Sequence, residues 1–303
     1  MGGGIAQVLA LAGARVALAD VSSEATAANQ ARLLDESRQF VADGLFPAGA
    51  TETLEANLWV APSIEAAVAE AEFIEECVPE VLGLKRDVLA MVSAAAPAPS
   101  VLASNTSTIS IAELAVAVQG PERFLGVHFS NPAPFIPGVE LIPHESTSDN
   151  ALATAREVVA ACGKQGALVH NKTGFVLNRL QFTLFSEAAQ LVEEGVATAE
   201  DVDLIVRTTF GFRLPFFGPF AIADMAGLDV YAFCFQSLAQ GFPGRFAIPE
   251  ALRRQVEAGR FGTKTGGGFI DIPADRTAEL VAYRNRAYVA MQKLLDELGP
   301  PPI

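Results

Sequence analysis

The chain has little of what disulfide-bonded, metal-binding or nucleic-acid-binding proteins need. Its 303 residues include three cysteines and three histidines, and 21 Lys and Arg stand against 35 Asp and Glu. Cys77, Cys162 and Cys234 are scattered and odd in number, which is typical of small buried residues in a reducing compartment and not of a disulfide framework or zinc site. The net charge of −14 argues against nucleic acid or an anionic membrane as a partner.

A membrane span and a secretory leader are also missing from the sequence. We find no apolar run long enough to cross a bilayer, and the N-terminus has neither the basic region nor the cleavage site of a signal peptide. We therefore expect a cytoplasmic protein, without a metal site. Half of the residues are apolar, so the chain can bury the core of one large or two medium domains.

Strand and helix patterns alternate through the first 169 residues and then give way to long helical patterns. Apolar strand-like stretches such as RVALAD, EFIEECVP and RFLGVHFS recur between helical ones, which is typical of a doubly wound parallel sheet. The sequence predicts an α/β fold, with a Rossmann-like domain over residues 1–169 and an all-helical domain over residues 170–303. Two of the longer predicted helices cover residues 22–45 and 218–242.

The opening stretch MGGGIAQVLALAGARVALAD resembles the second half of a dinucleotide-binding fingerprint. That fingerprint is a strand, G-x-G-x-x-G, a helix, and an acid about 20 residues further on. Gly2 takes the position of the third glycine, which lets the helix pack on the sheet. Asp20 ends the next strand, where a carboxylate can bind both ribose hydroxyls of NAD and repel the 2′-phosphate of NADP. Taken alone, the stretch fits a glycine-rich helix start equally well.

Seven motifs in family order resemble the L-3-hydroxyacyl-CoA dehydrogenases and their relatives that oxidise free 3-hydroxy acids such as L-gulonate. They span residues 1 to about 270 and are MGGGIAQ, EECVPEVLGLK, ASNTSTISI, RFLGVHFSNPAPF, GVELI, GFVLNRL and GTKTGGGF. The resemblance implies NAD as cofactor and a homodimer formed through the helical domain. In that family a strand and two glycines precede the residues matching Met1 and Gly2. We therefore expect a truncated chain or an internal start, with a central strand lost from the sheet.

His128 and Glu140 are the candidate proton-transfer pair. Histidine titrates near neutral pH and can take a hydroxyl proton while hydride leaves the same carbon. A carboxylate on the other ring nitrogen would fix the tautomer. A core histidine and a surface glutamate are the alternative interpretation. The resemblance places the family's catalytic histidine and glutamate on these two positions.

The stretch SNTST follows a strand, so we expect it at the carboxyl edge of the sheet, where ligands bind in such folds. A turn with a helix cap is a compatible interpretation. The resemblance implies that Ser107 bonds the substrate's 3-oxygen, that Asn178 holds the substrate from the second domain, and that Asn105 lines the nicotinamide pocket. It adds further expected cofactor contacts at Asn131, Glu80 and Lys85.

The substrate is the least determined part of the prediction. The phosphates of CoA need cationic partners, yet residues 29–58 carry only Arg32 and Arg38 among several acids. Pro137-Gly138 is similar to the L-gulonate relatives, whereas HFSNPAP and GTKTGGGF are similar to the acyl-CoA enzymes. We favour an L-3-hydroxyacyl-CoA over a free hydroxy acid. A non-catalytic dinucleotide-binding protein is a further alternative, and an enzyme with a lysine base is disfavoured because GFVLNRL has only Lys172 nearby.

Overall fold

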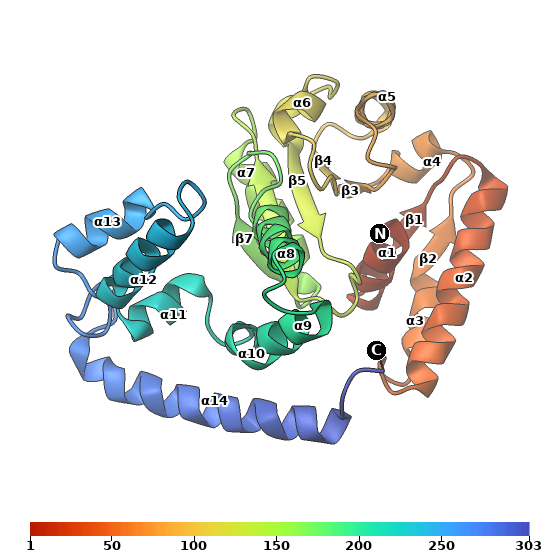
Figure 1. Ribbon diagram of the computed structural model, residues 1–303. Helices are drawn as coiled ribbons and strands as arrows, with labels where there is room; N and C mark the ends of the chain where they lie inside the picture. Colours follow the sequence, from red (N-terminus) through yellow and green to blue (C-terminus); the bar gives the residue numbers. More distant parts are fainter. Residues whose placement is uncertain (303) are drawn as a thin grey trace. The chain divides into compact units, whose positions relative to one another are not determined.

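The computed structural model describes residues 1–302, which group into two compact units (Figure 1). The first unit is Met1–Leu184, and the second begins at Phe185, inside one helix. The boundary expected between residues 169 and 170 stays a prediction. Among residues 1–302, each helix is too short or too polar to cross a membrane.

The first unit carries two β-sheets. The parallel pair is β1 (Val16–Leu18) with β2 (Leu58–Val60). The second sheet has the order β3 (Phe73–Glu76), β4 (Val101–Ser104), β5 (Phe124–Phe129), β6 (Gly138–Pro143) and β7 (Gln165–Leu168). Its pairs are parallel except β5 with β6. The loop over residues 130–137 is too short for the crossover that a parallel neighbour requires, so β6 runs back along β5.

The strands of the first unit are divided between these two sheets, and the expected loss of a central strand stays a prediction. Within the described residues, β1 pairs only with β2, and β3 pairs only with β4 on that side. The residues of β1 and most of those of β3 are half-buried, whereas β4 is buried throughout. Glu75 on β3 has two buried carboxylate oxygens without a hydrogen-bond partner in residues 1–302. Burial raises the pKa of this carboxyl well above its usual value.

Helices cover both faces of the larger sheet (Figure 1). In chain order the helices of this unit are α1 (Gly2–Leu11), α2 (Ser23–Ala42), α3 (Ala50–Asn57), α4 (Ile64–Val68), α5 (Leu82–Ala95), α6 (Ile111–Ala115), the 3-10 turn η1 (Pro121–Arg123) and α7 (Asp149–Ala161). The Ser22 and Ser148 hydroxyls cap α2 and α7 by accepting from Ala25 N and Ala151 N. The helix expected over residues 22–45 ends earlier, and Gly44 follows it with a φ of 71°.

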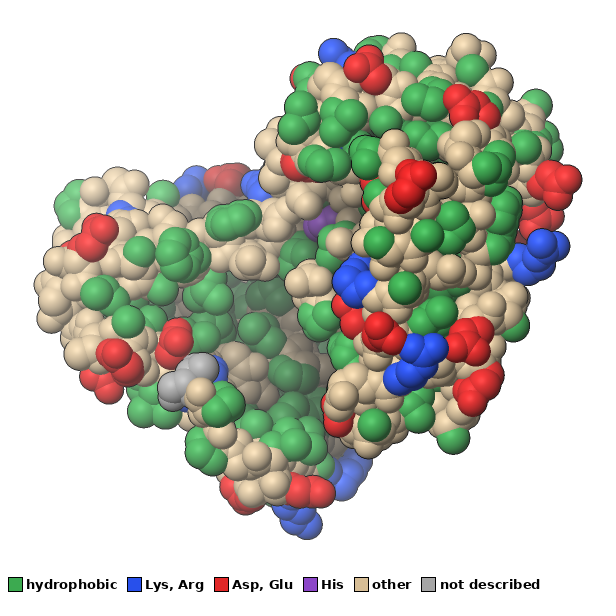
Figure 2. Space-filling model, turned by 90° about the vertical axis from the view of Figure 1, so that its right-hand side faces the viewer, with side chains coloured by type: hydrophobic (Ala, Val, Ile, Leu, Met, Phe, Trp, Pro, Cys, Tyr) green, Lys and Arg blue, Asp and Glu red, His purple; other side chains and the backbone are tan. Residues whose placement is uncertain are grey.

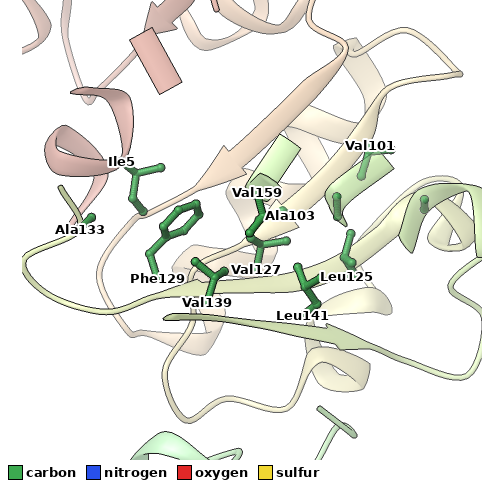
Figure 3. Close-up of a cluster of buried hydrophobic side chains, with 12 residues drawn as sticks. Ile5, Val101, Ala103, Leu125, Val127, Phe129, Ala133, Val139, Leu141 and Val159 are labelled. Carbon is green, nitrogen blue, oxygen red and sulfur yellow. The ribbon is translucent and has the colours of Figure 1, made fainter. Parts of the chain in front are cut away.

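The two faces of β5 have different neighbours. Figure 3 shows Val127 and Phe129 on the face that packs against Ile5 of α1 and Val159 of α7. Because side chains alternate along a strand, His128 points to the opposite face. That face contains a second buried cluster, which includes residues of α5, α6 and the segment before α8.

The second unit is helical, as the sequence predicts. After α8 (Leu177–Glu193), which begins in the first unit, come α9 (Ala199–Thr208), α10 (Phe210–Arg213), α11 (Pro219–Ala226), α12 (Leu228–Gly241), α13 (Glu250–Glu257), η2 (Ala274–Arg276) and α14 (Thr277–Leu298). The expected single helix over residues 218–242 is two helices. Gly227, with a φ of 104°, separates them, since this conformation is incompatible with a continuous helix.

The GTKTGGGF motif folds around the buried carboxylate of Asp224. The two carboxylate oxygens of Asp224 accept hydrogen bonds from Phe269 N at 3.1 Å and from Ile270 N at 2.6 Å. A Cβ on Gly268 would collide with Asp224 Oδ1. At Gly262 and Gly268 the loop therefore lies too close to Asp224 of α11 to leave room for a side chain.

Candidate active site

His128 and Glu140 lie directly opposite each other on β5 and β6. Residues that are directly paired in antiparallel strands project from the same face of the sheet. His128 and Glu140 are therefore in contact although they are twelve residues apart in the sequence. Nδ1 of His128 lies 2.7 Å from Oε2 of Glu140, and the residues are 5% and 8% exposed. When the carboxylate accepts from Nδ1–H, the lone pair on Nε2 is left to take a proton from a substrate.

The second carboxylate oxygen of Glu140 holds the start of α8. Oε1 accepts from Val176 N at 2.8 Å and from Leu177 N at 3.0 Å. Burial opposes ionisation of Glu140, but the hydrogen bonds from His128, Leu177 and Val176 outweigh it and lower the pKa of this carboxyl. The group is therefore a carboxylate at neutral pH, and it stabilises an imidazolium on His128.

The SNTST turn lies at the carboxyl end of β4, beside the end of β5. Asn105 Oδ1 accepts from Phe129 N at 2.7 Å, so this amide connects the two strand ends. Asn178 Nδ2 donates to the carbonyl of Ser107 at 2.8 Å. The turn thus connects Ser107 to Asn178, while Asn105 in the same turn contacts the end of β5. The expected roles of Ser107 and Asn178 toward the substrate and of Asn105 toward the nicotinamide stay predictions.

The carboxylate of Glu80 accepts several hydrogen bonds from the same turn. Its Oε1 accepts from Ser107 N at 2.9 Å, Thr108 N at 2.8 Å and Thr106 Oγ1 at 2.7 Å. Burial disfavours the charge, but these bonds and nearby Lys85 lower the pKa of Glu80 to about 2. Its side chain is 36% exposed, so the carboxylate can hold the turn and still face a ligand.

Lys85 is buried among protein acceptors. Its side chain is 1% exposed, and Nζ lies 2.9 Å from Glu76 Oε1 and 2.9 Å from the carbonyl of Val78. Ser104 Oγ donates to the other oxygen of Glu76 at 2.6 Å. Direct contact of Glu80 or Lys85 with a cofactor stays a prediction. In the structure Lys85 pairs with Glu76 on β3, and Glu76 in turn accepts from Ser104 on β4.

A hollow lies at the carboxyl ends of β1 and β2, where the resemblance predicts the adenosine end of the cofactor. Its lining includes Asp20, Ser22 and Ser63, at the starts of α2 and α4. Asp20 is exposed, and its oxygens accept from Val21 N at 2.7 Å and Asn29 Nδ2 at 2.9 Å. Exposed acceptors at a strand end are suited to a ribose diol.

Gly2 begins α1 beside the end of β3. A Cβ there would lie 3.1 Å from Cβ of Cys77. This spacing is tight for any side chain, which agrees with the packing role of the third fingerprint glycine. The first turn of α1 has amide groups that can face an anion.

Asn131 is exposed in the loop between β5 and β6, and no described contact assigns it a partner side chain. Lys164 holds this loop by donating to the carbonyls of Ala133 at 2.7 Å, Pro134 at 3.0 Å and Ile136 at 2.9 Å. Burial lowers the pKa of Lys164. This lysine could not be predicted from the sequence, because contacts to backbone carbonyls leave no residue pattern.

Comparison with known proteins gives consistent matches over nearly the whole chain. Residues 1–173 match the 3-hydroxyacyl-CoA dehydrogenase NAD binding domain, and residues 174–272 match the 3-hydroxyacyl-CoA dehydrogenase C-terminal domain. A 3-hydroxybutyryl-CoA dehydrogenase of Bradyrhizobium diazoefficiens is 34% identical over 272 residues, covering 89% of this chain and 92% of the relative.

For two further relatives the matched region includes the C-terminal helix of this chain. The 5-formyl-3-hydroxy-2-methylpyridine 4-carboxylate 5-dehydrogenase of Mesorhizobium japonicum is 33% identical over 300 residues, covering 98% of this chain and 95% of the relative. The crystal structure of a 3-hydroxyacyl-CoA dehydrogenase from Archaeoglobus fulgidus has a TM-score of 0.76 at 29% identity, covering 99% and 95% of the two chains.

The Rossmann-like sheet, with a histidine–carboxylate pair near the carboxyl end of β5, is typical of a nicotinamide-dependent dehydrogenase. The matched domains specify which one. The chain belongs to the 3-hydroxyacyl-CoA dehydrogenase family, and the predictions of that family, of an enzyme and of NAD as cofactor are confirmed.

Proposed function

We propose that the protein interconverts an L-3-hydroxyacyl-CoA and the 3-oxoacyl-CoA with NAD. The observation that carries this proposal is the buried pair of His128 and Glu140, which leaves Nε2 of the histidine for the substrate hydroxyl. Relatives from Bradyrhizobium diazoefficiens and Bacillus subtilis are named as 3-hydroxybutyryl-CoA dehydrogenases, which supports an acyl-CoA substrate. This activity suits fatty acid metabolism in the cytoplasm, and three free cysteines agree with a reducing compartment.

Proton transfer is assigned to residues of the first unit. Gly2, Asp20 and neighbouring groups would hold NAD, which would supply the acceptor for the hydride that leaves C3 of the substrate. His128 Nε2 takes the hydroxyl proton, and Glu140 stabilises the charge that forms on the ring. In the reverse direction, His128 returns this proton while Ser107 and Asn178 hydrogen-bond the 3-oxygen.

A free hydroxy acid is the second candidate substrate, and the electrostatics of α2 favour it. Arg38 pairs with Asp35 at 2.5 Å and with Glu55 at 3.0 Å, and Arg32 pairs with Glu36. Both arginines of α2 therefore already have carboxylate partners, which would compete with a CoA phosphate. The Mesorhizobium japonicum relative is named for a pyridine carboxylate, a substrate without CoA.

The substrate is tested by comparing acetoacetyl-CoA with acetoacetate in NADH oxidation. We expect kcat/KM to be higher for acetoacetyl-CoA by about 100-fold, which corresponds to roughly 2.7 kcal/mol of additional transition-state binding from the CoA portion. Equal or better turnover of acetoacetate would favour the second candidate. A folded protein that binds NADH in a fluorescence titration but reduces neither compound would instead be the non-catalytic dinucleotide-binding alternative.

We also propose that the protein is a homodimer formed through the second unit. Phe185 on α8 and Phe233 on α12 are 69% and 68% exposed, and α8 has no buried residue. On the face seen in Figure 2, hydrophobic side chains lie between scattered charged ones. Exposed aromatic side chains at this density are typical of a surface that a partner covers.

Light scattering after size exclusion tests the dimer. We expect twice the chain mass of 31.8 kDa for the wild type and the single-chain mass for a Phe185→Asp, Phe233→Asp double variant, because a charge opposes burial at an interface. Val116→Asp is the matched control, since Val116 is 75% exposed but lies in the first unit. A dimer that survives the double variant would refute this surface.

A further inference from the structure

We infer that Phe175 is a positioning residue, which fixes the base His128 and the start of α8 together through Glu140. The inference rests on the proposed function, because it concerns how the proton acceptor of that reaction is held. Phe175 lies between Gly174 and the residues whose amides bind Glu140.

The backbone of Phe175 adopts a conformation that side chains disfavour. In residues 1–302 it is the only non-glycine residue with a positive φ, at 49°. Gly174 precedes it with a φ of 75°. Two successive left-handed residues turn the chain so that the amides of Val176 and Leu177 both reach Oε1 of Glu140, at 2.8 Å and 3.0 Å. The unfavourable conformation thus supplies two donors to the carboxylate.

The aromatic ring explains why this position is not another glycine. Phe175 is 2% exposed, and its ring centroid lies 5.9 Å from that of His128. It belongs to the buried cluster that includes Leu102 and Ile142. A glycine would relieve the backbone but would leave a space beside the imidazole. The ring keeps water away from the bond between His128 and Glu140, which strengthens that bond.

Glu140 consequently links two parts of the site. Oε2 faces His128, while Oε1 is occupied by the two amides, so the carboxylate cannot rotate without losing one set of bonds. The residue after Leu177 is Asn178, which bonds the carbonyl of Ser107. The segment of residues 174–178 therefore sets the base and the groups expected around the 3-oxygen in one geometry. Placement of this kind matters because small displacements of reacting groups cost large factors in rate.

The test compares Phe175→Gly and Phe175→Leu with the wild type. For Phe175→Gly we expect kcat of acetoacetyl-CoA reduction to fall by about tenfold or more, with KM for NADH within about twofold of the wild type. The pH profile of kcat/KM should also change, because water reaches the pair. Phe175→Leu keeps an apolar side chain and should restore part of the lost kcat. Unchanged kcat in both variants would overturn the inference.

Amide hydrogen exchange gives a readout that does not need turnover. We expect Val176 and Leu177 to exchange faster in Phe175→Gly than in the wild type, whereas a purely space-filling role predicts protection equal to the wild type. Phe124→Leu is the matched control, since Phe124 is buried in the same cluster but lies at the far end of β5. It should lower the Tm without changing kcat or the exchange of these two amides. If the wild type turns over no substrate, the proposed function fails, and the exchange measurement still decides the role of Phe175.

Discussion

Replacing His128 by glutamine is expected to lower kcat in both directions by about 10²–10⁴-fold, the usual contribution of a general acid–base residue. Glutamine can still donate to Glu140 from its amide, but it cannot accept a proton from the substrate. Because the substitution keeps the size of the side chain and one hydrogen bond, we expect NADH affinity to stay within about twofold. Steady-state assays with acetoacetyl-CoA and a fluorescence titration of NADH measure the two quantities.

His144→Gln is the matched control for this variant. His144 is a histidine of the same unit whose Nε2 lies 3.0 Å from the carbonyl of Pro121, away from the SNTST turn. We expect the control to keep its turnover. A loss of less than tenfold in His128→Gln, or an equal loss in His144→Gln, would mean that another group accepts the proton. Lys172 would then be the first residue to test, because it is the nearby lysine that the alternative enzyme class would require.

The sequence predicted a contact between His128 and Glu140 but not the strand pairing that produces it. The strand patterns around His128 and Glu140 suggested parallel strands, in which these residues need not meet. The structure brings them together because β6 is antiparallel to β5 in a register that pairs the two residues. The second role of Glu140, holding Val176 and Leu177, could not be foreseen, since it depends on where the chain returns 36 residues later. Local patterns contain no information on such a return.

Lys85 illustrates a different limit of sequence reasoning. Glu80 and Lys85 lie five residues apart, a pattern typical of exposed charged side chains at a helix start, and the family resemblance implies contact with the cofactor. The main partner of Lys85, Glu76, lies nine residues earlier on a strand. No spacing rule relates a strand residue to a helix residue that packs over it. The burial of Lys85 therefore could not be predicted from the sequence and is known only from the fold. The same holds for Ser104, which completes the network from β4.

Lys85→Met should therefore be tested first as a stability variant. It is expected to destabilise the protein by about 3–5 kcal/mol, the usual cost of breaking a buried ion pair by removing one partner. Val78 N and Ser104 Oγ would still donate to Glu76, each at 2.6 Å, but the carboxylate would lose the ammonium that balances its charge. Chemical denaturation followed by circular dichroism measures the change.

The double variant Glu76→Gln, Lys85→Met separates charge from shape. Glutamine at position 76 keeps a carbonyl oxygen that accepts from Val78 N, and its amide can donate to the Ser104 hydroxyl. Methionine at position 85 fills the space of the lysine stem. With both charges gone, we expect most of the lost stability to return, because a buried pair contributes little beyond a well-packed neutral replacement. If Lys85 acts instead as a direct cofactor ligand, Lys85→Met will unfold at the wild-type midpoint and lose NADH affinity, and the second substitution will not restore that affinity. The stability of the single variant thus decides whether this lysine holds the sheet edge or the cofactor.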